Sequence, residues 1–224
     1  MKFDKTLHIA REESFEIEHP EVTVMSITSE VTIVESRDGK CYVKILADSE
    51  RARDLAELVA IVESRGKLTV RVDKKSHSFW GLGDGELHGL SIELALPKVA
   101  NLKIKTISGD IEVNQALASL QIGSISGGVV ISQNPGTTCV VKTVSGDIAT
   151  HTFSACDYTL KSISGDIKVH VAPDLNVDVD GNSVSGDLNS EISLDGASDS
   201  PANSNKVVRI TTSTISGDFN LVRN

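Results

Sequence analysis

Aromatic side chains are scarce in this sequence of 224 residues, at 4% of the total, and the low count argues against a carbohydrate-binding surface lined with rings. No apolar run approaches the ~20 residues that a membrane-spanning helix needs, so no integral membrane segment is expected. Acidic residues outnumber basic ones, and the formal net charge is −9. Because phosphate backbones and anionic lipids bind basic faces, neither nucleic acid nor a membrane surface is expected as a partner.

Cysteine is also rare, and its three copies, Cys41, Cys139 and Cys156, are odd in number and lack the spacing of a metal site. We expect free, buried thiols in a reducing cytoplasm; a Cys139–Cys156 disulfide is the alternative. Residues 1–5 lead straight into an alternating strand pattern without the apolar core of a signal peptide. The expected localisation is therefore cytoplasmic.

What the sequence does contain is a repeated Ser-Gly-Asp tripeptide. It occurs at residues 108–110, 145–147, 164–166, 185–187 and 216–218, and the variant Ser-Gly-Gly stands at 126–128. The glycines are 18, 19, 19, 21 and 31 residues apart. A nearly fixed period of this length indicates a repeat architecture, in which each repeat contributes one structural unit.

Each repeat carries apolar residues at four fixed positions, counted from its glycine: minus seven, minus five, minus two and plus two. In the first repeat these are Leu102, Ile104, Ile107 and Ile111. Alternation of this kind predicts strands with one buried face, and we assign all four positions to that face. Because the parity changes between minus five and minus two, the chain must bend between minus three and minus two.

Small residues mark the bend. Position minus three always carries a hydroxyl, which can bond a nearby backbone group: Thr106, Ser124, Thr143, Ser162, Ser183 and Thr214. The glycine is expected to supply a left-handed or otherwise strained turn conformation. The residues assigned to these structural turns are Ser108, Gly109, Asp110, Gly127, Gly146, Asp147, Gly165, Asp166, Gly186, Asp187, Gly217 and Asp218.

Identical corners at one period predict an all-β fold: a parallel β-solenoid, like a β-helix, of about 19-residue coils, in which each coil stacks on the one before it in the chain at ~4.8 Å. The alternative is an antiparallel meander with Ser-Gly-Asp hairpins, which gives no reason for identical turns along one side. Residues 101–224 form the regular repeats, continuous with an irregular β region over residues 1–100. A surface loop at 195–205 accounts for the 31-residue step.

The first hundred residues contain a disguised copy of the repeat, in which Ser29 takes the place of the glycine. Strands are expected at 41–46, 68–73 and 90–96. One amphipathic helix is expected at 48–64, since Leu55, Leu58, Val59 and Val62 form one apolar stripe. We expect this helix to start at Asp48 or Ser49, to end at residues 65–66, and to cover an open edge or end of the sheet.

A glycine-rich stretch at 76–89 holds the only tryptophan. Phe79 and Trp80 on such a loop suit contact with a protein partner. The alternative is that Trp80 folds back over an open apolar end of the stack.

The recurring aspartates would form a row of like charges, each repelling the next by about 1 kcal/mol in water. Turn amides, divalent cations, or the lysines at minus four (Lys105, Lys142 and Lys161) could offset the repulsion. We favour the turn role over calcium, because calcium-binding β-rolls carry several ligands in each short repeat. No metal or cofactor is predicted.

Carboxylate catalysis is the enzymatic alternative, and it needs acids that converge in one groove. Here one acid per coil stands at a corner, and Asp157, His151 and His170 are interpreted as scattered surface groups. We therefore predict that the protein is not an enzyme and has no catalytic residues.

The block at 96–111, which runs from Leu96-Pro97 through Asn101-Leu102-Lys103-Ile104 to Ser108-Gly109-Asp110-Ile111, together with the later Ser-Gly-Asp copies, resembles the bacterial putative-adhesin family with its toastrack domain. The resemblance covers residues 97–224 well and the preceding N-terminal part of the chain more loosely. It implies a solenoid-like, non-catalytic interaction scaffold, with related domains in envelope-stress signalling proteins. A protein partner or self-association, such as a homodimer through open ends, is expected. A carbohydrate-binding or carbohydrate-active protein is the alternative function.

Overall fold

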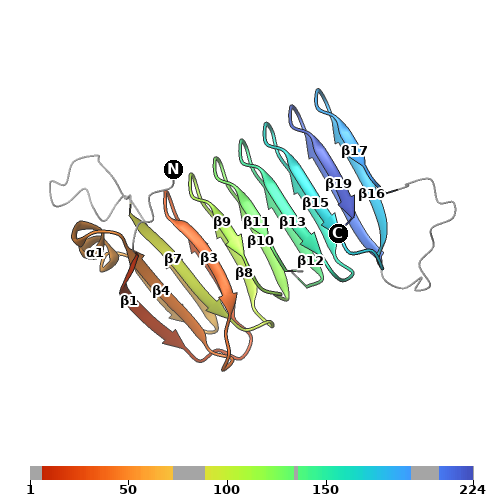
Figure 1. Ribbon diagram of the computed structural model, residues 1–224. Helices are drawn as coiled ribbons and strands as arrows, with labels where there is room; N and C mark the ends of the chain where they lie inside the picture. The colour runs from red at the N-terminus through yellow and green to blue at the C-terminus, as the bar shows by residue number, and fades with distance from the viewer. Residues whose placement is uncertain (1–6, 73–88, 134–135, 193–206, 224) are drawn as a thin grey trace.

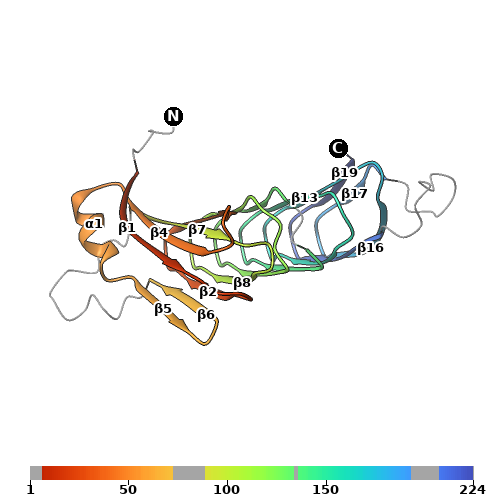
Figure 2. The ribbon, with the colours of Figure 1, turned by 90° about the horizontal axis from the view of Figure 1, so that it is seen from below.

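Each regular coil is a pair of strands, because the apolar alternation runs on both sides of the Ser-Gly-Asp corner. The computed structural model describes residues 7–72, 89–133, 136–192 and 207–223. The coils stack into an elongated body with two facing sheets, seen from the side in Figure 1 and from below in Figure 2. Two strands on opposite sheets thus form one coil, such as β8 with β9.

The first sheet has ten strands. In spatial order they are β1 (His8–Phe15), β4 (Cys41–Ala47), β7 (Leu90–Leu96), β3 (Glu30–Glu35), β9 (Ile111–Val113), β11 (Val129–Ile131), β13 (Ile148–Thr152), β15 (Ile167–Val171), β19 (Phe219–Arg223) and β17 (Leu188–Ser190). The second sheet has nine strands. Their order is β16 (Asn176–Ser183), β18 (Val207–Thr214), β14 (Asp157–Lys161), β12 (Thr138–Lys142), β10 (Ser119–Gly123), β8 (Asn101–Lys105), β2 (Glu21–Met25), β6 (Lys67–Arg71) and β5 (Ala60–Ser64).

Strand pairing between coils is parallel and keeps equivalent residues in register. Leu102 pairs with Leu120, and Leu120 pairs with Cys139. On the other sheet Ile111 pairs with Val129. The predicted parallel solenoid is confirmed, and the antiparallel meander is wrong for this part of the chain.

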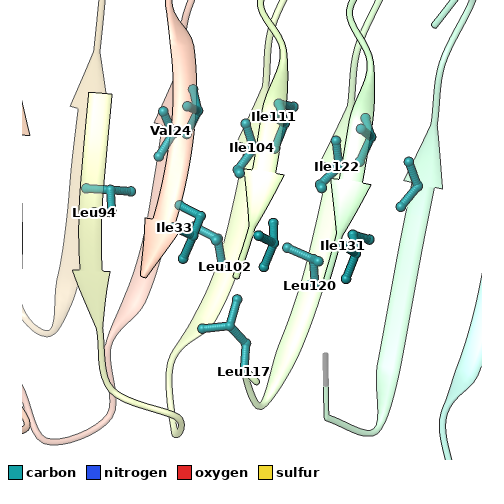
Figure 3. Close-up of a cluster of buried hydrophobic side chains, with 14 of the residues drawn as sticks. Val24, Ile33, Leu94, Leu102, Ile104, Ile111, Leu117, Leu120, Ile122 and Ile131 are labelled. Carbon is teal, nitrogen blue, oxygen red and sulfur yellow. The ribbon is translucent and has the colours of Figure 1, made fainter. Parts of the chain in front are cut away.

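The core lies between the two sheets. Figure 3 shows Leu102 and Ile104 of β8 near Ile111 of β9, with Leu120 and Ile122 of β10 beside them. All five side chains are buried, at no more than 2% exposure. Because like residues stack on like residues, each regular coil adds an apolar layer from positions minus seven, minus five and plus two, and each layer completes the burial of its neighbours.

The order of the coils in space departs from their order in the chain. The last coil in the chain consists of β18 and β19. In space it lies between the coil of β14 and β15 and the coil of β16 and β17, although β16 and β17 precede it in the sequence. A simple succession of coils was expected, and this expectation is wrong at the C-terminal end. Residues 176–190 therefore form the outermost coil of that end.

At the other end the disguised repeat around Ser29 is confirmed. Val22 pairs with Leu102 and Val31 pairs with Ile111, in the register of the regular coils. The expected strands at 68–73 and 90–96 are β6 and β7, which pair with β2 and β3 and so add one more coil outside this one. Beyond it, β4, β1 and β5 pair antiparallel and end the stack.

The one helix among the described residues, α1 (Glu50–Ala56), is shorter than the predicted 48–64. Ser49 caps its start and accepts from the backbone N–H of Ala52 at 3.2 Å. The helix packs against β1, β4 and β7 at the end of the stack, which is the expected covering role. Its buried residues, Ala52, Leu55 and Ala56, close the core there.

The second half of the predicted helix is strand β5 instead. Its branched side chains favour strand, and Arg65 and Gly66, at φ 52° and 80°, form the two-residue hairpin turn that joins β5 to β6. Leu58 and Val62, which were assigned to the apolar stripe, are exposed.

Candidate interaction surface

The Ser-Gly-Asp corners join the second sheet to the first and lie in one row along the upper edge of the stack in Figure 1. Backbone hydrogen bonds connect each corner to the next. The N–H of Ser126 donates to the carbonyl of Ile107 at 2.8 Å, and that of Ser145 donates to Ile125 at 2.9 Å. The tripeptides therefore occupy equivalent positions on one edge, which we call the corner edge.

At four of the six corners the hydroxyl at minus three forms a hydrogen bond within the turn, on its inner side. Ser162 Oγ accepts from the N–H of Gly165 at 2.8 Å, and Thr214 Oγ1 accepts from Gly217 at 2.9 Å. Thr143 differs, since its Oγ1 donates to the carbonyl of Gly146 at 2.8 Å. All of these hydroxyl residues except Ser183 are buried, so the bonds satisfy polar groups that water cannot reach. Among the described residues, Thr106 Oγ1 and Ser124 Oγ have no hydrogen-bond partner.

The glycines are required by close stacking rather than by backbone conformation. None of the six corner glycines has a positive φ, so the expected left-handed conformation is wrong. A Cβ on Gly146 would meet the carbonyl of Gly127 well inside 3.0 Å, and one on Gly165 would meet the carbonyl of Gly146 equally closely. Any side chain would therefore separate two coils whose strands are hydrogen-bonded on both sheets.

The aspartates form a ladder held by backbone amides. Asp147 Oδ1 accepts from the N–H of Asp166 at 2.9 Å, and Asp166 Oδ1 accepts from Asp218 at 2.9 Å. At the interrupted position Asp110 accepts from the N–H of Gly128, also at 2.9 Å. Four of the five carboxylates thus gain a charge-assisted bond from the neighbouring coil, since Asp218 accepts from Asp187 in the same way, and these bonds offset the repulsion along the row.

The side chains at position minus two lie outside the core, so their predicted burial is wrong. Six of these side chains are exposed, from 41% to 76%: Ile107, Ile125, Val144, Ile163, Ile215 and Val184. Minus three and the glycine both face inward, so the two residues between them, minus two and minus one, turn outward together. We call these six residues the aliphatic row. The parity change in the sequence was its signal.

Charged rows flank the aliphatic row on both sides. Lys105, Lys142 and Lys161 are exposed at the ends of the second-sheet strands, two residues before the aliphatic row. The aspartates lie on the first-sheet side, three residues after it, and all are exposed except Asp218, which is half-buried. The described residues offer these three lysines no ion-pair partner. The corner edge therefore presents parallel basic, apolar and acidic rows.

The scattered polar groups considered as an enzymatic alternative do not converge. His151 and His170 pair across β13 and β15 with their rings stacked at 4.4 Å. Asp157 lies on the other sheet, where it forms an ion pair with Arg209 at 3.5 Å. Among the described residues no group of three or more potential ligands could hold a metal ion.

The three cysteines are free and buried, as predicted. Burial raises the pKa of the Cys41 thiol to about 11 and that of Cys156 to about 12. Burial also raises the pKa of Cys139 well above its ordinary value. These thiols are core side chains and take no part in the corner edge.

Phe79 and Trp80, the predicted partner contact, lie at 73–88, outside the described residues. Among the helical segments that the structure describes, none has the length and apolarity of a membrane span.

Comparison with known proteins agrees with this architecture. The Toastrack DUF4097 family model matches residues 19–122 and 83–222. A search of proteins with curated functions found no match. A "putative cell adhesion protein" from Clostridium sporogenes is similar in structure, with a TM-score of 0.56, 10% identity and coverage of 96% of this chain and 99% of the other. A "putative adhesin" from Bacteroides fragilis gives 0.50 and 12%, with coverage of 99% and 98%.

The two solved structures share the solenoid fold with this chain at an identity too low to carry more than the fold. The two segments matched by the family model together span nearly all of the described coils, including the disguised repeat around Ser29. The protein belongs to the Toastrack DUF4097 family.

Proposed function

We propose that the protein is a non-catalytic, adhesin-like interaction scaffold that binds a protein through its corner edge. The aliphatic row is the observation that carries this proposal, since it holds six exposed Ile and Val side chains on one straight edge. Its exposed area is on the order of 500 Å², at the upper end of the ~300–600 Å² of the largest apolar patch on a typical monomer. Patches of that size with a polar rim commonly mark interaction sites.

The corner edge is also rigid, which favours binding. Its backbone is held by hydrogen bonds between all neighbouring corners, by the inward hydroxyls and by the aspartate ladder. A surface that is already ordered loses little conformational freedom when a partner binds, so more of the contact energy appears as affinity.

Photo-crosslinking in the native bacterium tests this function. A photoreactive amino acid replaces Ile125 or Ile163 on the row, and Val99, equally exposed on the opposite edge, serves as the control position. We expect discrete protein adducts from positions 125 and 163 and none of these from 99. The same adducts from all three positions, or none at the row, would overturn the proposal. Adducts with glycans in place of proteins would favour the carbohydrate-binding alternative.

We further propose a cytoplasmic location and a role in bacterial envelope-stress signalling. Three buried, free thiols support a reducing compartment, and the resemblance to adhesin-like signalling domains supports the role. Cell fractionation tests the first. For the second, a strain carrying an Ile125→Ser, Ile163→Ser chain should lose the transcriptional response to envelope damage, whereas a Val99→Ser strain should keep it. An unchanged response in both strains would remove the signalling role.

A further inference from the structure

We propose that the partner seated on the aliphatic row is a second copy of this chain, aligned parallel to the first. This inference rests on the proposed function, because it names the occupant of the same surface. Three observations favour a second copy: the repeat distance of the row, the order of the charged rows beside it, and the nature of the two ends of the stack.

The repeat distance selects the partner. The six aliphatic side chains come from coils paired as parallel strands, so they recur every ~4.8 Å. A helix offers side chains on one face at ~5.4 Å per turn and falls out of step within a few turns. A second copy has the same spacing by construction, so each aliphatic side chain can lie against its equivalent in the other copy along the whole row.

The charged rows set the orientation. In a two-fold dimer with the axis along the row, the lysine row of one copy lies opposite the aspartate row of the other. Lys142 then faces the coil that carries Asp147 in the second copy. With the axis across the row, lysines face lysines instead, and Lys142 faces Lys161. Unlike charges attract and like charges repel, so the parallel arrangement is favoured.

The rows beside the aliphatic row also bring the buried area of the interface to the size that a stable dimer needs. A stable interface buries roughly 800 Å² on each partner, more than the aliphatic row alone supplies. The neighbouring rows of exposed serine, lysine and aspartate side chains lie on the same edge and extend the contact on both sides. The result has an apolar centre and a polar rim, as specific interfaces do.

The ends of the stack are poor alternatives for self-association. At one end α1 and the antiparallel strands cover the core. At the other end the outermost strand of the second sheet, β16, carries Asp178 and Asp180, and the outermost strand of the first sheet, β17, has three residues. Charges and short length on an edge strand prevent pairing with another edge. Association is therefore lateral, along the row.

Sedimentation of the purified full chain tests the pairing. We expect the wild type to form a dimer at micromolar concentration, and the double variant Ile125→Ser, Ile163→Ser to raise the dissociation constant at least tenfold. Val99→Ser is the matched control and should leave the constant unchanged. Circular dichroism establishes that the variants are folded. A wild type that stays monomeric up to about 0.5 mM would overturn the inference.

The variant Lys142→Glu tests the orientation. In the parallel dimer the new glutamate faces the aspartate row, so the dissociation constant should rise about tenfold. In the antiparallel dimer it faces Lys161, and the constant should fall. Spin labels attached after Glu112→Cys or Asn189→Cys should give one short distance between equal positions at each end. A short distance only between 112 and 189 would overturn the parallel arrangement.

Failure of this inference differs from failure of the proposed function. A monomeric protein whose row crosslinks another protein in cells keeps the function and removes the second copy. A row that yields no specific protein adduct, and no dimer, removes both.

Discussion

The chain turns between the two sheets at both edges of the stack, but the corner edge and the opposite edge close the core in different ways. Between β8 and β15 every Ser-Gly-Asp corner has five residues between its strands, whereas the turns of the opposite edge have four to six. On the opposite edge buried side chains of different coils, such as Leu117 and Leu175, fill the end of the core. A turn filled by side chains can vary from coil to coil, but a corner closed by backbone stacking cannot.

The comparison shows why only one edge is visible as a repeat in the sequence. At the corner edge the limit is the carbonyl of the previous glycine, which leaves no room for a Cβ. At the opposite edge one turn also needs glycine, since Gly136 has a φ of 75° and a Cβ on it would meet the carbonyl of Leu117, but Pro173 occupies the equivalent turn of another coil. The turns of the opposite edge therefore differ in sequence from coil to coil, whereas the six regular corners all keep glycine.

The largest effect is expected for Gly146→Ala, in the middle of the corner edge. The methyl group meets the carbonyl of Gly127 and must separate two coils, so the free energy of unfolding should fall by more than about 3 kcal/mol. Urea denaturation followed by circular dichroism measures it. Gly123→Ala is the matched control, because nothing lies within 4 Å of its new Cβ, and should stay within about 0.5 kcal/mol of wild type. Equal losses in both variants would contradict close stacking as the reason for glycine.

A smaller effect is expected for Ser162→Ala, which removes the inward acceptor of one corner. The buried N–H of Gly165 then loses its partner at 2.8 Å, and stability should fall by about 2 kcal/mol. Ser164→Ala changes an exposed hydroxyl of the same corner and should cost less than about 0.5 kcal/mol. If the two variants were equally stable, the inward hydroxyl row would have no structural role.

The smallest effect concerns alkaline pH and the buried thiols. The folded protein keeps Cys41 and Cys156 protonated up to pKa values of about 11 and about 12, while the unfolded chain releases these protons near the ordinary value of 9.0. The contribution is fully present below pH 9 and is lost as the pH rises toward these folded values, so stability should fall over that range. Denaturation of wild type and Cys156→Ala at pH 8 and 10.5 measures the difference. The variant should show the weaker pH dependence, and an equal or stronger one would contradict the assignment.

Two elements of the N-terminal half show which parts of the fold could be predicted from the sequence. The disguised coil around Ser29 was predictable, because its apolar residues keep the register of the other coils without the glycine. The end of the helix was not, since the stripe that includes Leu58 and Val62 fits both a helix and an edge strand. Pairing of residues 60–64 with β6 decides between them, and that pairing depends on a hairpin turn of only two residues.

The exposure of the aliphatic row could likewise not be predicted from the sequence, although its residues were identified as apolar positions of the repeat. An Ile at minus two is as apolar as one at minus five, so composition alone assigns both to the core. Only the outward turn of two consecutive residues at each bend separates Ile107 from Ile104. The proposed partner contact at the corner edge follows from that difference.

The amino-acid sequence by itself determined the length of each coil, the parallel register and the chemistry of the corner, because these depend on neighbouring residues within one repeat. Tertiary structure alone decided the spatial order of the last two coils and the burial of each apolar position. The reason is physical: equivalent coils offer equivalent edges, so a strand such as β18 can pair with any of them. Only the competition among complete stacks selects its neighbours.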